Sequence, residues 1–170
     1  MARVTYLNLF SESRNNVVSL ISNKSNVSDP TNSTAEFRKW IYSRDPDVKA
    51  SDFKKYPFII IHPASFSPSE TGSSLDRKSN FVSWEIEVEV VTSDRGYGEN
   101  DGRALSHMDS ISDDIMTTLL NATNRQTLAG QSMYFSNPQT TDVVPDVLHN
   151  ERIYRRSILC SFRSRITVSA

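Results

Sequence analysis

The chain has 170 residues, of which 37% are hydrophobic and 23% are charged, so it is too apolar for a disordered protein and long enough to bury a core. Its formal net charge is -1, and it therefore lacks the basic excess with which bulk nucleic-acid binders neutralise phosphates. A single cysteine, Cys160, excludes a framework of intrachain disulfides. We expect one domain over residues 1–170, with a helix and a flexible segment in residues 1–35 and an α+β core in residues 36–170.

The first predicted element is an amphipathic helix over residues 4–22, interrupted near residues 11–13. Six apolar side chains lie near one stripe of it: Val4, Leu7, Phe10, Val17, Leu20 and Ile21. The sequence has no secretory signal and no apolar run long enough to span a bilayer, so we expect a cytoplasm-like setting without membrane contact. Residues 22–34 are dense in Asn, Ser, Asp and Thr, which predicts a loop or a flexible arm.

Two short strands are predicted next. Residues 36–43 are rich in aromatic side chains, and residues 58–62 form a β-branched run that is typical of a buried strand. Pro57 and Pro63 fix the ends of the second strand, because proline cannot donate to the ladder. Residues 64–80 are rich in Ser, Pro, Thr and Gly and predict a long linker.

Residues 81–93 form the clearest strand, with period-two alternation. One face holds Val82, Trp84, Ile86, Val88 and Val90, and the other holds Ser83, Glu85, Glu87 and Glu89. Residues 102–122 predict a helix with Asp101 as its N-cap, because apolar side chains recur at spacings of three and four. That apolar stripe consists of Leu105, Met108, Ile111, Ile115 and Leu119.

The remainder contains a loose stretch, residues 123–151, with a short strand at 133–135, and then a long strand at 152–168. On one face of that strand lie Tyr154, Ile158, Cys160, Phe162, Ile166 and Val168; on the other lie Arg155, Leu159, Arg163, Arg165 and Thr167. We interpret Cys160 as a small buried hydrophobe. The whole pattern predicts an α+β fold, with a mostly antiparallel sheet, two principal amphipathic helices packed on one of its faces, and long extended loops.

No constellation of catalytic residues is apparent. The three histidines, His62, His107 and His149, lack the spacing of a local metal motif. Asp113 and Asp114 are adjacent on a helix and so diverge by about 100°. The turn at residues 94–102 fits neither a phosphate loop nor an EF-hand. We therefore expect no enzymatic activity, no catalytic residues, no cofactor and no bound metal.

The most informative feature is the charge on the two long strands. Glu85, Glu87 and Glu89 project from one, and Arg155, Arg163 and Arg165 project from the other. These charges could pair within one sheet, which is the favoured interpretation because such pairs are common and each contributes only about 0.2–1 kcal/mol. Alternatively, the acidic strand of one subunit faces the basic strand of the next, which would orient subunits in a ring. The two interpretations can coexist.

The order of the elements resembles that of the tail terminator, or tail completion, proteins of long-tailed bacteriophages. The resemblance covers residues 36–170 and lies in the segments FIIIH, SWEIEVEVVTSD, ALSHMDSISDDIMTTLLN and RIYRRSILCSFRSRITVS. It implies a virion protein of the tail or neck, assembled in the host cytoplasm. Such proteins form a hexameric ring that ends the tail tube, contacts the tail tube protein and the head connector, and passes double-stranded DNA through its lumen. Glu85, Glu87 and Glu89 then become candidates for a surface facing the lumen or a neighbouring subunit.

Two alternatives remain open from the sequence. One is another neck component, such as a head-completion or stopper protein, which binds the portal side. The other is a small hydrolase or metal-dependent enzyme that uses His62 or His149 with scattered carboxylates. Oligomeric state and the effect of chelation separate these classes.

Overall fold

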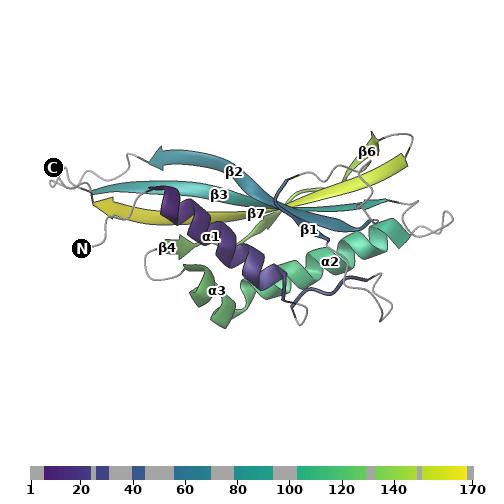
Figure 1. Cartoon of the computed structure of the whole chain (residues 1–170), viewed down its shortest axis with the longest axis horizontal. Helices are drawn as coiled ribbons and strands as arrows, with labels where there is room; N and C mark the ends of the chain where they lie inside the picture. The colour runs from purple at the N-terminus through teal and green to yellow at the C-terminus, as the bar shows by residue number, and fades with distance from the viewer. Residues whose placement is uncertain are drawn as a thin grey trace.

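The computed structural model describes residues 6–23, 26–30, 40–44, 56–69, 79–93, 103–129, 133–148 and 151–167. Within these ranges the chain forms three helices and a seven-stranded, mostly antiparallel sheet, which confirms the predicted α+β class (Figure 1). The elements in chain order are α1 (Tyr6–Ile21), β1 (Ile41–Tyr42), β2 (Phe58–Ser69), β3 (Ser79–Ser93), α2 (Arg103–Leu120), α3 (Ala122–Ala129), β4 (Met133–Phe135), β5 (Gln139–Thr140), β6 (Val144–Leu148) and β7 (Glu151–Thr167).

Three long strands, β2, β3 and β7, form the body of the sheet. β3 lies in the middle and pairs antiparallel with β2 on one side and with β7 on the other. The short strands complete the edges: β1 runs parallel to the start of β2, while β4, β5 and β6 pair in turn with the outer edge of β7. β3 and β7 run along most of the length of the molecule (Figure 1).

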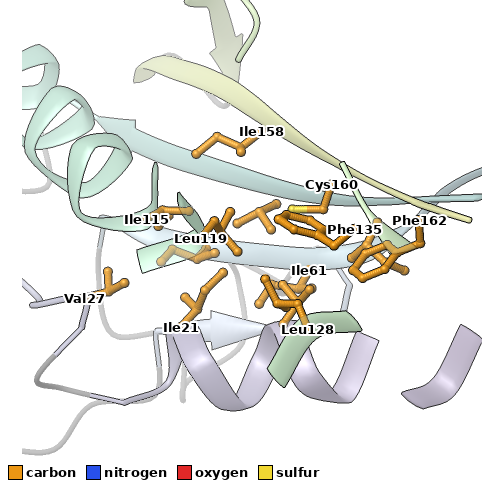
Figure 2. Packing of buried hydrophobic residues seen from close by; sticks show 14 of the residues in the cluster. Ile21, Val27, Ile61, Ile115, Leu119, Leu128, Phe135, Ile158, Cys160 and Phe162 are labelled. Carbon is orange, nitrogen blue, oxygen red and sulfur yellow. The ribbon is translucent and has the colours of Figure 1, made fainter. Parts of the chain in front are cut away.

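All three helices lie on one side of the sheet, which we call the covered face (Figure 1). The predicted apolar side of β3 points into this layer, and its five side chains, from Val82 to Val90 in steps of two, are at most 2% exposed. Figure 2 shows Ile21, Leu119 and Leu128, one from each helix, in the same apolar layer as the side chains of Ile61 of β2 and Phe162 of β7. Burial of this continuous layer is the main force that holds the helices on the sheet.

Trp84 lies at the centre of the covered face and joins it to α1. Its ring stacks on Phe162, with centroids 5.9 Å apart, and meets Phe10 edge-on at 5.3 Å. Its indole Nε1 donates a hydrogen bond of 2.9 Å to the hydroxyl of Ser13, which itself donates to the carbonyl of Phe10. The predicted interruption of the first helix is therefore wrong, because α1 is continuous. Ser13 is buried, and its hydroxyl accepts the hydrogen bond that the buried indole N–H of Trp84 donates.

A second apolar cluster lies at one end of the other side of the sheet, opposite the covered face. It consists of Tyr56, Phe58, Ile60, Val91 and Ile153, with Tyr42 packed against it. The rings of Tyr42 and Phe58 meet edge-on at 5.9 Å, and those of Tyr56 and Phe58 lie 5.3 Å apart. The polar part of this face therefore begins beside this cluster, with Glu89 opposite Ile60 and Arg155 opposite Val91.

β2 is longer than predicted. Its expected end at Pro63 is wrong, because the strand continues to Ser69 through a shift of register between Pro63 and Ser65. A bulge tolerates a residue without an N–H, and β1 pairs only with Ile59 and Ile60, so Pro63 removes no ladder bond on that side. Residues 64–69 of the predicted linker are thus strand, and residues 70–78 lie outside the described ranges.

The stretch at residues 123–151 has more structure than predicted. Strand β4 confirms the short strand at 133–135, but helix α3 and strands β5 and β6 were missed. Asn121 caps α3, because its Oδ1 accepts from the backbone N–H groups of Thr123 and Asn124 at 3.0 and 3.3 Å.

Helix α2 follows the predicted stripe with one exception. Met108, Ile111, Ile115 and Leu119 are buried, whereas Leu105 is 45% exposed and Ala104 takes the buried position. Asp101, the predicted N-cap, lies outside the described residues.

Part of the predicted loop or flexible arm packs against α2. Val27 is buried in the main core. The carboxylate of Asp114 accepts from the N–H and the hydroxyl of Ser28, and Thr118 donates to the carbonyl of Asn26. Asp114 is therefore tied to residues 26–30 instead of only facing solvent. None of the described helices is long and apolar enough to cross a membrane.

Candidate functional site

The side of the sheet away from the helices holds the charged residues that the sequence singled out. We call it the open face, because none of the described helices lies on it (Figure 1). Its side chains share the odd-numbered positions of β3 and β7 and the positions opposite them in the neighbouring strands. The open face comprises His62 and Ser65 of β2, Phe81, Ser83, Glu85, Glu87 and Glu89 of β3, Tyr134 of β4, and Arg155, Ser157, Leu159, Ser161 and Arg163 of β7.

Glu85 has neutral partners on both sides. Its Oε2 accepts from the hydroxyl of Ser65 at 2.8 Å, and its Oε1 accepts from the hydroxyl of Ser161 at 3.2 Å. No cation in the described part of the chain lies within ion-pair distance of this carboxylate. Its charge is therefore hydrogen-bonded but not neutralised by these residues.

Glu87 lies between Glu85 and Glu89 on the open face of β3. The hydroxyl of Ser157 donates to its Oε1, and the imidazole Nε2 of His62 lies 3.6 Å from its Oε2. This contact with His62 becomes an ion pair only when the imidazole is protonated. Glu87 thus resembles Glu85 in that no described lysine or arginine lies within ion-pair distance of its carboxylate.

Glu89 differs from both, because it has a permanent cation beside it. The guanidinium Nη1 of Arg155 lies 2.9 Å from its Oε1, and the Nε of Arg155 lies 4.0 Å from Asp146 of β6. The side chains of Arg155 and Glu89 are 24% and 15% exposed. For this pair, the charges of the two long strands do meet within one sheet, as the favoured interpretation expected.

Arg163 is not paired in that way. Its guanidinium carbon lies 4.3 Å from the centre of the Phe81 ring, a cation–π contact, and its side chain is exposed. It forms no ion pair with any described residue. Tyr134 lies opposite Arg163 in the ladder and is 75% exposed. The in-sheet interpretation is therefore wrong for Arg163, and the side chain of Arg165, opposite Phe81, lies outside the described part of the structure.

Several residues of the open face were not singled out from the sequence. The hydroxyls of Ser65, Ser157 and Ser161 hold the glutamates, and Tyr134 flanks Arg163. Ser157 and Ser161 could have been found by parity, since they share the odd positions of the last strand with Arg155. Ser65 could not, because the bulge in β2 changes which residues face Glu85.

The other titratable groups are dispersed over the fold. His107 is half-buried on α2, and His149 lies outside the described residues. Cys160 is buried on the covered face, as expected, and burial raises the pKa of its thiol to about 12. Arg156, also on the covered side, pairs with Asp109 of α2 at 2.8 Å. The described residues contain no group of three or more His, Cys, Asp or Glu side chains placed to hold a metal ion.

The open face is thus a surface of mixed charge, with carboxylates at its centre and, at one end, Arg163 over the ring of Phe81 and opposite the exposed Tyr134 in the ladder. No family model and no curated protein sequence matches the chain. The open face is the charged surface from which a proposal of function can be argued. Its composition suits contact with another macromolecule.

Proposed function

We propose that the chain is a structural virion protein, a tail terminator that forms a hexameric ring, ends the tail tube and joins the tail to the head connector. The observation that carries this proposal is the open face. Strands of 12, 15 and 17 residues form the body of one sheet, but the described helices cover only one side of it. The other side presents charge and exposed aromatic surface that a neighbouring subunit or the ring lumen would use.

The order of elements supports the same proposal. The segments on which the resemblance rests follow one another as β2, β3, α2 and β7, although β2 is longer than the short strand FIIIH of that pattern. In such a ring the lumen passes double-stranded DNA. Glu85 and Glu87, which no arginine neutralises among the described residues, are suited to a surface that repels phosphates and so does not retain DNA.

The test is assembly of the purified chain with its tail tube protein. We expect rings at the ends of tail tubes by electron microscopy, and a mass corresponding to a hexamer on tube ends or at high concentration. A free monomer at low concentration is compatible with mass action, so a concentration series is needed. The proposal fails if the chain stays monomeric throughout the series and binds neither tail tubes nor connector. Binding to the portal side alone would instead indicate a stopper protein.

A further inference from the structure

We propose that both edges of the sheet are closed to pairing with a strand of another chain, and that this closure keeps free copies from joining edge to edge. The two edges are the outer side of β2 and the short strands that lie along β7. An open edge presents unpaired N–H and C=O groups, which are a template for strand addition. The inference concerns these edges alone and does not depend on the tail terminator proposal.

The hydrogen bonds of β2 identify which of its backbone groups point away from β3. The N–H of Ile59 donates to the carbonyl of Trp40 at 2.7 Å, so the backbone groups of Ile59 point outward, toward β1. Because this direction alternates along a strand, those of Ile61 and Pro63 also point outward. Among the described strands, only β1 pairs with this edge, and its pairing ends at Ile60.

The bulge in β2 shifts this alternation by one residue. The ladder partners of His62 and Ser65 are glutamates two positions apart in β3, Glu87 and Glu85. Residues two positions apart direct their backbone groups to the same neighbouring strand, so His62 and Ser65 both face β3. The outward positions after the bulge are therefore even-numbered, and Pro68 is one of them. Each proline of β2 thus removes a donor from the free edge and none from the ladder with β3.

Side chains of the same chain occupy carbonyl groups of this edge. The Nε of Arg14, on α1, donates to the carbonyl of Ile61 at 3.4 Å. The imidazole Nδ1 of His62 lies 3.3 Å from the carbonyl oxygen of Pro63, and it donates to that oxygen in the tautomer that carries the proton there. An incoming strand would find no donor at Pro63 and would have to displace two side chains to reach these acceptors.

The other edge of the sheet uses proline in the same way. The N–H of Thr141 donates to the carbonyl of Ser157 at 2.9 Å, so the odd-numbered residues of β7 direct their backbone groups to the short strands. Tyr154 therefore faces β3, and the nitrogen of Pro145, its ladder partner in β6, points away from the sheet. All prolines within the described strands share this placement: Pro63, Pro68 and Pro145.

The lengths of the edge strands explain where closure is needed most. Strands β4, β5 and β6 have 3, 2 and 5 residues, and strands this short are poor templates by themselves. Strand β2 has 12 residues and continues past Pro63 with its ladder to β3, so its prolines do not end the strand. They act on what could bind its outer side.

The test restores the missing donors in the double variant P63V/P68V. Valine adds an N–H at both outward positions and favours strands. We expect the concentration at which half of the chains are self-associated, measured by sedimentation velocity, to fall at least about tenfold relative to wild type. Hydrogen exchange of residues 61–69 should be slower in the associated state than in the monomer, because their outward N–H groups are then bonded.

The matched control is P30V, which adds the same groups in a described segment outside the sheet and should leave self-association unchanged. Adding R14M to P63V/P68V removes the donor to the carbonyl of Ile61 and should strengthen self-association further. Circular dichroism checks that each variant folds. If P63V disturbs the bulge and lowers the melting temperature, P68V alone provides the test, with a smaller change in the same direction.

Each outcome decides the inference. Stronger self-association with slower exchange in residues 61–69 supports it. Unchanged self-association of P63V/P68V, or of P68V where that variant alone provides the test, overturns it. Stronger association without slower exchange in β2 also overturns it, as would slower exchange of residues 61–69 in assemblies of the wild type. The tail terminator proposal is tested separately, by binding of the wild-type chain to tail tubes.

Discussion

The two faces of β3 use the same strand in opposite ways. On the covered face, alternate side chains from Val82 to Val90 are at most 2% exposed and lie in the apolar core, where Trp84 makes one hydrogen bond. On the open face, the residues between them are Ser83 and three glutamates, and the glutamates are held by hydroxyls, an imidazole and an arginine. The covered face stabilises the fold by removing area from water, whereas the open face keeps its charges satisfied and accessible.

Because of this difference, truncating a side chain to alanine should lower the free energy of unfolding more on the covered face than on the open face. A large side chain removed from the covered face leaves a cavity that the rest of the core cannot fill. A side chain removed from the open face leaves partners that water can solvate. The predictions below test that contrast, beginning with the largest expected effect.

Trp84→Ala should destabilise the protein by about 3–5 kcal/mol, because it removes the largest fully buried side chain together with its stacking on Phe162. Chemical denaturation gives the free energy of unfolding. The matched change on the neighbouring residue of the open face, Glu85→Ala, should cost less than about 1 kcal/mol. Similar losses for the two variants would contradict the contrast between the faces.

The buried thiol of Cys160 should make the free energy of unfolding depend on pH. Burial raises the pKa of its thiol from 9.0 to about 12, so above pH 9 the unfolded chain loses a proton that the folded chain keeps. The contribution of the protonated thiol to the free energy of unfolding is fully present below pH 9. It is lost as pH rises toward 12, at about 1.4 kcal/mol per pH unit. The measurement is the difference in free energy of unfolding between wild type and Cys160→Ala. This difference should stay constant below about pH 8 and fall between about pH 9 and 11; a flat difference would show that the thiol is accessible to water.

Ser13→Ala should destabilise the protein by about 1–3 kcal/mol, because it leaves the buried indole N–H of Trp84 without its acceptor. The control is Ser19→Ala on the exposed side of α1, which should be neutral or slightly stabilising because alanine favours helices. Thermal melts of the two variants provide the comparison. Equal melting temperatures would mean that water or another group can replace the serine hydroxyl.

The smallest effect concerns the ion pair of the open face. A double-mutant cycle on Glu89 and Arg155 with alanine should give a coupling of about 0.2–1 kcal/mol that shrinks as salt is added. The same cycle on Glu85 and Arg163, measured at a concentration where the chain is monomeric, should give no coupling. A coupling as large as that of the first pair would contradict the arrangement in which serines hold Glu85 and Arg163 lies over Phe81.

Much of this fold could be predicted from local patterns. The alternation in β3 and β7 and the stripe of α2 identified which residues are buried, and the buried Trp84, Phe162 and Ile115 lie where the patterns placed them. Errors arose where a residue type suggested the wrong local structure. Pro63 suggested the end of a strand but lies in a bulge, and Ser13 suggested a break in a helix but binds a buried indole. A short helix such as α3, with little apolar periodicity, offered only the capping asparagine as a signal.

The sequence by itself determined which side of each long strand is apolar and which is charged, because alternation follows from the geometry of one strand and needs no partner. It could not determine the register in which β7 lies against β3. That register depends on contacts between residues that are far apart in the sequence, with separations of 70 and 76 positions for the two serine–glutamate hydrogen bonds. Register decided that Glu89 meets Arg155, that Glu85 meets serines, and that Arg163 lies over Phe81. The tertiary structure thereby separated the ion pair of Glu89 and Arg155 from Glu85 and Arg163, which form no ion pair with any described residue.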